Sequence, residues 1–170
     1  MQAGPNPSAT AGRRHMPLIR VLVVDDFAPW RQFVHSALQK HCYLRIVSEA
    51  SDGQQAVRKA MELQPDLILL DIGLPILNGI EVARQIRHLV PDARILFLSE
   101  NNSDDIADAA LNTGAGGYVI KSAAGTELLP AIQAVMEGRR FVSAKLNLPK
   151  VDDRLATADA DSEKTVTLPS

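Results

Sequence analysis

The chain is poor in cysteine, in aromatic residues and in long hydrophobic runs. Its 170 residues include a single cysteine, Cys42, and 4% aromatic side chains. One cysteine forms no disulfide within the chain and offers no zinc-binding pattern. No apolar run approaches the roughly 18 residues that a membrane-spanning helix needs, and no signal-peptide core begins the chain. The net charge of −2 argues against a general binder of polyanions. These absences predict a cytoplasmic protein that has no membrane contact.

Composition divides the chain into three zones. Residues 1–17 are poor in large apolar side chains and rich in small ones and proline, which predicts a flexible N-terminal tail. Residues 18–146 carry dense apolar periodicity and are predicted to form a single domain. Residues 147–170 are polar and acidic on balance, which predicts a flexible C-terminal tail.

Within the middle zone, short apolar runs alternate with segments of helical periodicity. Five runs are expected to be buried strands, at residues 19–24, 44–47, 66–70, 93–98 and 118–120. A segment with apolar residues at helical spacing follows each of them. Strict alternation of this kind predicts a five-stranded parallel sheet with helices on both faces, which is a doubly wound α/β fold.

Polar residues stand where four of the predicted strands end. Asp25 and Asp26 follow the first strand and Asp71 the third. Ser99 follows the fourth strand and Lys121 the fifth. Because the carboxyl ends of parallel strands share one edge of the sheet, where ligands bind, we expect these five residues to converge on one cleft.

The residue types in this cleft predict phosphoryl chemistry. Crowded carboxylates repel one another unless a cation offsets their charge, and carboxylate oxygens suit Mg²⁺, which also binds phosphate oxygens. Lys121 adds a fixed positive charge, and the hydroxyl of Ser99 can donate a hydrogen bond. A carboxylate beside Mg²⁺ and a lysine can accept a phosphoryl group, so Asp71 is a candidate phosphoacceptor.

These motifs resemble the receiver domains of bacterial two-component response regulators. They are residues 21–26 (VLVVDD), residues 69–81 (LLDIGLPILNGIE), Leu98-Ser99 and residues 117–121 (GYVIK). The absence of proline after the lysine, in residues 121–123 (KSA), is similar to the LuxR/FixJ-type subfamily, whose output is a helix-turn-helix domain. The resemblance implies a flavodoxin-like fold with strand order 2-1-3-4-5.

The resemblance also assigns expected roles to residues of the cleft. It implies that Asp71 is the phosphoacceptor and that Asp25 and Asp26 hold Mg²⁺ together with Asp71. It places the backbone carbonyl of Gly73 in the same metal site. Asp26 is expected to be a direct metal ligand.

Two further residues are expected to respond to phosphorylation. The resemblance implies that Ser99 is a switch hydroxyl that moves toward the phosphoryl group, and that Tyr118 is a switch aromatic. Lys121 is expected to pair with the phosphoryl group. Receivers take phosphoryl groups from a sensor histidine kinase or a phosphotransfer protein, and signal through the face of the fourth helix, fifth strand and fifth helix. Dimerisation through that face, and contact with an unknown downstream protein, are hypotheses from the same resemblance.

Other functions compete with that of a phosphorylated receiver. A LuxR-type output domain needs roughly 60 residues with basic side chains for phosphate contacts, whereas only about 30 residues, acidic on balance, follow the last predicted helix. No DNA binding is therefore expected from this chain alone, and it could be a truncated LuxR-type transcription regulator. A receiver-like interaction module that is not phosphorylated is another alternative. An aspartyl-nucleophile phosphatase would need a second acid two residues after Asp71, where Gly73 stands, so we expect no enzyme beyond phosphoacceptance and slow loss of the group to water.

Overall fold

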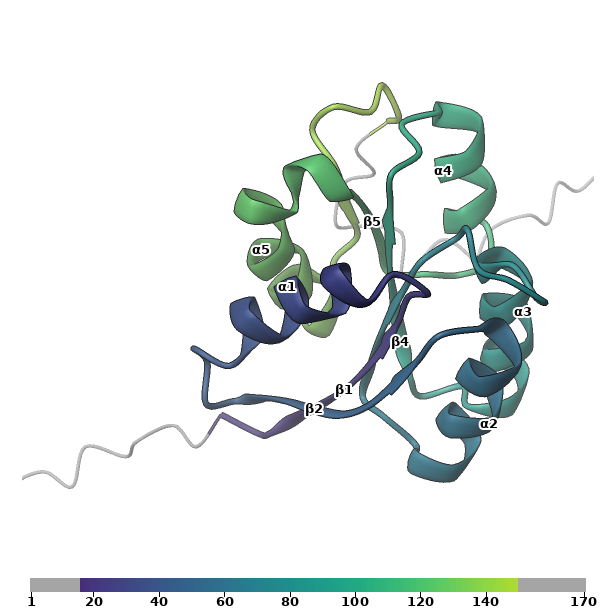
Figure 1. Ribbon diagram of the computed structural model, residues 1–170. Coiled ribbons are helices and arrows are strands. Elements are labelled where there is room, and N and C mark those ends of the chain that lie inside the picture. Colours follow the sequence, from purple (N-terminus) through teal and green to yellow (C-terminus); the bar gives the residue numbers. More distant parts are fainter. Residues whose placement is uncertain (1–15, 150–170) are drawn as a thin grey trace, which may run out of the picture.

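The computed structural model describes residues 16–149, which form one parallel sheet between two layers of helices (Figure 1). The tails predicted for 1–17 and 147–170 lie almost wholly outside these residues. The strand order is β2-β1-β3-β4-β5-β6, so the doubly wound order predicted for the first five strands is confirmed. The strands are β1 (Ile19–Val24), β2 (Leu44–Ala50), β3 (Leu67–Leu70), β4 (Arg94–Ser99), β5 (Gly117–Ile120) and β6 (Phe141–Val142). The helices are α1 (Ala28–Leu38), α2 (Gly53–Leu63), α3 (Gly79–Leu89), α4 (Asp104–Leu111), α5 (Ala124–Met136) and a 3₁₀ turn at Lys121–Ala123.

The two faces of the sheet carry separate hydrophobic clusters. Helices α1 and α5 cover one face, and α2, α3 and α4 cover the other (Figure 1). Successive side chains of a strand point to opposite faces. In β1, Val21 and Val23 belong to the cluster beneath α1 and α5, whereas Leu22 and Val24 belong to the opposite one. Burial on both faces explains why this strand reads as an unbroken apolar run.

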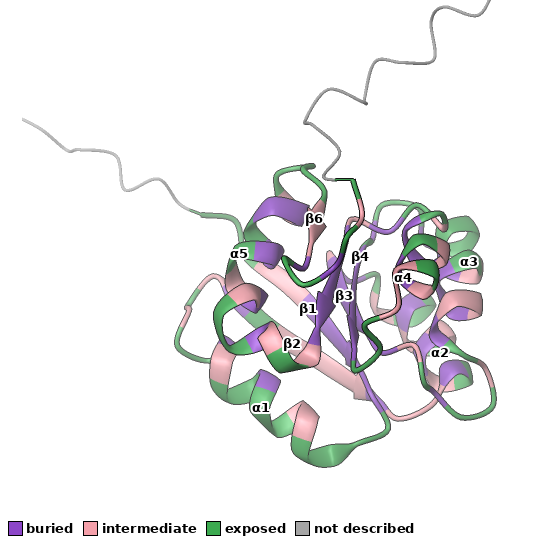
Figure 2. Cartoon of the chain, turned by 90° about the horizontal axis from the view of Figure 1, so that it is seen from above, coloured by how far each residue is buried: buried purple, intermediate pink, exposed green. Residues whose placement is uncertain are grey.

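The prediction of five strands was one short. β6 holds only Phe141 and Val142, and it pairs in parallel with the outer edge of β5. A strand of two residues is too short to show a period in the sequence, because alternation needs at least about four residues to be recognised. Its position is set by backbone pairing with β5, which precedes it in the chain by the whole length of α5. Figure 2 shows β6 beside α5.

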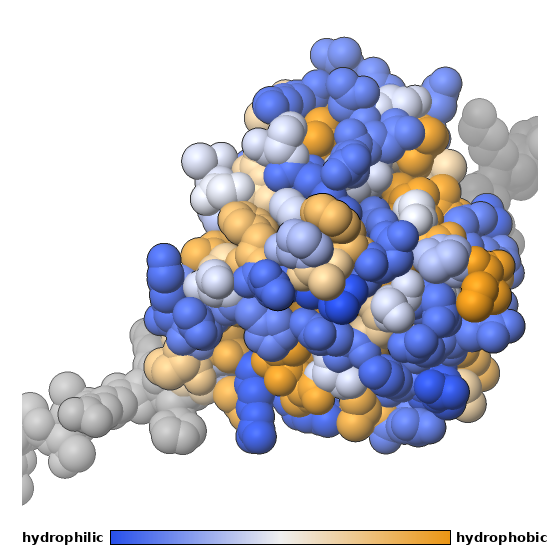
Figure 3. All heavy atoms as spheres, in the orientation of Figure 1, coloured by the Kyte–Doolittle hydropathy of each residue, from blue (hydrophilic) through white to orange (hydrophobic). Residues whose placement is uncertain are grey.

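Hydrophilic side chains prevail on the face drawn in Figure 3, and hydrophobic ones lie in small separate patches. Most large apolar residues are instead held in the two clusters against the sheet. Among residues 16–149, no helix combines the length and the apolar character that crossing a lipid bilayer requires.

Gly79 allows α3 to begin directly against the end of β3. A Cβ at this position would lie 2.0 Å from the backbone oxygen of Asp71. The N–H of Gly79 donates to the carbonyl of Ile72 at 2.8 Å, which holds the two segments in this close contact. The side chain of Asn78 caps the helix by accepting from the N–H of Glu81. A side chain at position 79 would therefore displace the backbone that carries Asp71.

We expect Gly79→Ala to lower the free energy of unfolding by about 3 kcal/mol or more, because the collision is with backbone atoms that have no room to yield. Gly125→Ala in α5 is the matched control, since nothing lies within 4 Å of a Cβ there. That control should be neutral or stabilising by up to about 1 kcal/mol. Urea denaturation of both variants measures the difference. Equal midpoints for the two would contradict the close-contact argument.

Candidate functional site

The carboxyl ends of β1, β3, β4 and β5 surround a hollow of about 630 Å³. It is lined by the five residues predicted from the strand ends, namely Asp25, Asp26, Asp71, Ser99 and Lys121. Backbone pairing sets these positions: the N–H of Asp71 donates to the carbonyl of Val24 at 3.0 Å, so the end of β3 is fixed to the end of β1. The parallel sheet therefore brings together residues up to 96 positions apart in the sequence.

Three carboxylates form the acidic part of this cleft. Oxygen atoms of Asp25, Asp26 and Asp71 lie within 4.8 Å of one another. Asp25 and Asp71 are buried, whereas Asp26 is exposed. Oxygen ligands at this spacing, open to water on one side, suit Mg²⁺, which binds a few carboxylates and keeps several water molecules.

Lys121 supplies the positive charge beside these carboxylates. Its Nζ lies 2.5 Å from Oδ2 of Asp25 and 3.6 Å from Oδ1 of Asp71, and its side chain is only 8% exposed. The ammonium group also lies 5.0 Å from the ring centroid of Trp30 in α1, within the range of a cation–π interaction. The other oxygen of Asp25 accepts from the N–H of Phe27 at 2.9 Å. Asp25 thus holds the lysine in place.

The environment of Asp71 disfavours its ionised form. Burial is the largest effect and raises the pKa of this carboxyl above its ordinary value. The charge of Lys121 opposes that rise, the charge of Asp25 adds to it, and backbone hydrogen bonds from Ile72 and Gly73 lower the pKa in part. A cation bound beside Asp71 would favour the ionised form, which is the nucleophilic one.

Ser99 and Tyr118 are linked through the loop between β4 and α4. The hydroxyl of Ser99 accepts from the N–H of Asn101 at 3.1 Å, and the hydroxyl of Tyr118 donates to the carbonyl of Asn101 at 2.8 Å. Tyr118 is completely buried. Burial is the largest effect on its hydroxyl and raises the pKa above the ordinary value. A hydrogen bond with Ser99 lowers this pKa in part, and the charge of Asp71 raises it. The hydroxyl is therefore a stable donor at neutral pH.

The remaining predicted residue, Gly73, also lines the cleft. Asn101, Glu100 and Trp30 contribute to the site but were not singled out as site residues from the sequence. Asn101 and Glu100 directly follow Ser99, so their position at a strand end could have indicated them. Nothing in the sequence indicates that Trp30 lies against Lys121, because that contact joins α1 to the end of β5.

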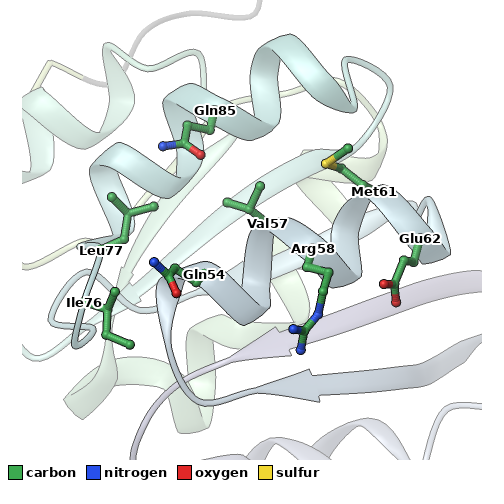
Figure 4. Close-up of a pocket in the computed structure, with 8 residues that line it drawn as sticks. All are labelled: Gln54, Val57, Arg58, Met61, Glu62, Ile76, Leu77 and Gln85. Atoms are coloured by element: carbon green, nitrogen blue, oxygen red, sulfur yellow. The ribbon is translucent and has the colours of Figure 1, made fainter.

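A second hollow, of about 500 Å³, lies between α2 and α3 (Figure 4). Val57 and Met61 line it from α2, and Ile76 and Leu77 from the loop that precedes α3. Its charged groups are Arg58 and Glu62. One carboxylate beside one guanidinium does not form a cluster of metal-binding oxygens, so the acidic cleft remains the candidate site.

Comparison with known proteins agrees with this fold. A family model described as the response regulator receiver domain matches residues 21–133. A crystal structure of a LuxR-family two-component response regulator from an Aurantimonas species is 35% identical, with a TM-score of 0.73, and the match covers 76% of this chain and 92% of that one. The response regulator domain of Thermotoga maritima CheB is 34% identical, with a TM-score of 0.66, and the match covers 71% of this chain and 97% of that one. The chain belongs to the receiver-domain family of two-component response regulators.

Curated relatives are longer than the matched region. The transcriptional regulatory protein DegU of Brevibacillus brevis is 30% identical over 150 residues, which are 87% of this chain and 64% of DegU. The response regulator GacA of Pseudomonas viridiflava is 33% identical over 129 residues, which are 76% of this chain and 60% of GacA. The chain therefore spans less than two thirds of the length of these relatives.

Asp71→Asn should raise the melting temperature at neutral pH in a buffer that contains EDTA. The pKa of Asp71 is raised on folding, so its ionised form costs stability at every pH above the folded pKa. This cost shrinks as the pH falls through the folded pKa and vanishes below the ordinary value of 3.8.

The melting temperatures of the wild type and Asp71→Asn should therefore differ most above the folded pKa of Asp71 and become equal in acid. Thermal unfolding across a pH series measures this difference. Asp26→Asn is the matched control, because Asp26 is exposed and its neutralisation should have little effect. A gain in stability for Asp71→Asn that grew toward acid pH would contradict the sign of the shift.

Proposed function

We propose that this chain is a phosphoacceptor module of a two-component phosphorelay, phosphorylated on Asp71 in the presence of Mg²⁺. The observation that carries the proposal is the convergence of Asp25, Asp26 and Asp71, with oxygens within 4.8 Å of one another, and the buried ammonium of Lys121 beside Asp25 and Asp71. A sensor histidine kinase or a phosphotransfer protein would be the donor, as for receivers generally. Membership of the receiver family and the chemistry of the cleft both support this reading.

The transfer is a substitution at phosphorus. A carboxylate oxygen of Asp71 bonds to the phosphorus while the bond from phosphorus to the donor's imidazole nitrogen breaks, and that nitrogen is left with the electron pair and later takes up a proton. Lys121 would move from Asp25 toward the new phosphoryl oxygens, to which it can donate charge-assisted hydrogen bonds. Ser99 would donate its hydroxyl hydrogen to the same group. The catalytic contribution is positioning and neutralisation of charge, and no other enzymatic activity is proposed.

The metal would be held by the three carboxylates and by the backbone carbonyl of Gly73. Both oxygens of Asp25 already have hydrogen-bond partners, Phe27 and Lys121, which leaves Asp26 and Asp71 best placed to bind Mg²⁺ directly. When bound, Mg²⁺ neutralises negative charge on the carboxylates and the incoming phosphoryl oxygens.

The signal would leave through α4, β5 and α5, and Tyr118 is the buried switch residue on that side. Its hydroxyl reaches the loop that follows Ser99 through the carbonyl of Asn101, so a change at the cleft can be transmitted to the start of α4. Contacts with a downstream protein, and dimerisation on phosphorylation, would use this face. DNA binding is not proposed for residues 16–149.

Incubation with acetyl phosphate and Mg²⁺ should increase the intact mass by one phosphoryl group. The increase should be absent in Asp71→Ala and in a sample with EDTA, because the first lacks the nucleophile and the second lacks the metal. Intact-mass spectrometry measures both. A folded wild-type chain that gained no phosphoryl group would contradict the proposal and favour the receiver-like interaction module.

The fluorescence of Trp30 should report Mg²⁺ binding. It is the only tryptophan of the chain, and Lys121, whose ammonium lies 5.0 Å from its ring, contacts two of the proposed ligands. A saturable change in emission is expected on titration with Mg²⁺. Asp26→Asn should weaken the apparent affinity by about tenfold or more, by analogy with losses at metal sites generally.

Glu100→Gln provides the matched control for that titration. Glu100 lines the same cleft but stands outside the group of three carboxylates, so its neutralisation should leave the apparent affinity within about twofold. Equal weakening by Asp26→Asn and Glu100→Gln would indicate diffuse attraction of cations and not the proposed ligand set.

A further inference from the structure

After α5 the chain folds back along the outer edge of β5. Residues 141–148, which we call the strap, begin with β6, and Phe141 and Val142 stand opposite Gly117 and Tyr118. The N–H of Phe141 donates to the carbonyl of Gly116 at 3.1 Å, and the N–H of Ser143 donates to the carbonyl of Tyr118 at 2.9 Å. The strap is the yellow-green segment of Figure 1. It occupies backbone groups of β5 that would otherwise form an open edge.

Polar contacts hold the strap on both sides of β5. On the side of α5, the carboxylate of Glu127 accepts from the hydroxyl of Ser143 and from the N–H of Ala144, the latter at 3.0 Å. On the side of α4, the carboxylate of Asp104 accepts from the N–H of Asn147 at 3.0 Å. Backbone N–H groups bonded to carboxylates are charge-assisted contacts, which are stronger than neutral ones.

Apolar side chains fix the strap to the core. Leu146 is 5% exposed and belongs to the hydrophobic cluster on the face of α2, α3 and α4. Val142 and Leu148 pack against the same cluster. The strap therefore contacts α4, β5 and α5, which are the three elements of the proposed output face.

A continuous series of hydrogen bonds joins the cleft to the strap. Ser99 is bonded to Asn101, Asn101 to Tyr118, and Tyr118 through its carbonyl to Ser143. Asp104, which holds the strap at α4, follows Asn101 by three residues along the chain. A hydroxyl of Ser99 that turned toward a phosphoryl group on Asp71 would move away from the N–H of Asn101, and so would disturb the loop that leads into α4 at Asp104.

We infer that the edge of β5 between α4 and α5 is a docking surface for an extended segment, occupied by the strap in the unphosphorylated chain and freed when Asp71 is phosphorylated. The inference rests on the proposed function and adds what that function leaves open, namely the occupant of the output face. Because coupling between two sites is reciprocal, loosening the strap must also favour the phosphorylated form.

Hydrogen exchange of the full chain tests the release of the strap, with beryllium fluoride and Mg²⁺ as the mimic of the phosphoryl group. The amides of Phe141, Ser143, Ala144 and Asn147 should exchange about fivefold faster or more with the mimic bound, while amides of β2 stay unchanged. Strap amides that remain equally protected, while the cleft binds the mimic, would overturn the inference and leave the proposed function intact. Failure to bind the mimic would overturn both.

A pair of variants in the first turn of α4 tests the reciprocal effect. Asp104→Ala removes a contact to the strap, whereas Asp105→Ala removes a charge from the same turn, and no hydrogen bond joins Asp105 to the strap in the described part of the chain. Asp104→Ala should bind beryllium fluoride about threefold to fivefold more tightly than the wild type, and Asp105→Ala should match the wild type. Equal affinities for the two variants would contradict the coupling.

Sedimentation of the same samples distinguishes release of the strap from its replacement by the strap of a second copy of the chain. Strap amides that stay protected in a chain that has dimerised with the mimic would mean that the strap of a second copy has replaced the first, which contradicts release. A sample whose strap amides exchange faster, as monomer or dimer, supports it.

Discussion

The acidic cleft depends on the ion pairs that the buried ammonium group of Lys121 forms with Asp25 and Asp71. Two buried carboxylates and a third beside them would repel one another, and Lys121 lies 2.5 Å from Asp25 and 3.6 Å from Asp71. Removing one partner of a buried ion pair leaves an uncompensated charge, which is strongly destabilising. The pair also ties the end of β5 to the ends of β1 and β3. In the proposed function the same lysine would also bind the phosphoryl group.

The neighbourhood of Asp71 is held at a cost to the stability of the fold. Burial raises the pKa of Asp71, so its ionised form is held at a cost to the folded state. Five residues later, Ile76 adopts a φ of 71°, a left-handed conformation that is unfavourable for a β-branched side chain. Gly79 then returns the chain to within contact of the backbone of Asp71. Strained or destabilised groups of this kind persist where the surrounding structure holds them, and they gather at functional sites.

The cleft and the far edge of the sheet are parts of one hydrogen-bonded system. Ser99, Asn101 and Tyr118 connect the end of β4 to β5, and the backbone of Tyr118 connects β5 to the strap. The buried ring of Tyr118 packs against Phe97 of the neighbouring strand, with ring centroids 6.4 Å apart. The side chain that is bonded to the loop is thus also packed in the core. A small movement at the cleft would therefore reach the edge of β5 through these contacts, as the inferred release of the strap requires.

The sequence by itself determined the kinds of element, their order and the set of polar residues at the strand ends. These features follow from local periodicity and from the rule that parallel strands end at one edge, so the sequence alone predicts that Asp25, Asp71, Ser99 and Lys121 share one cleft. Only the tertiary structure decided that Lys121 is held by Asp25 and lies against Trp30, and that the hydroxyl of Tyr118 bonds to Asn101. Only the tertiary structure showed β6 and the strap, because a strand of two residues is too short to give a periodic pattern in the sequence. The physical reason is the same in each case: these contacts join segments remote in the chain through rotamers and backbone pairing, which leave no local pattern in the sequence.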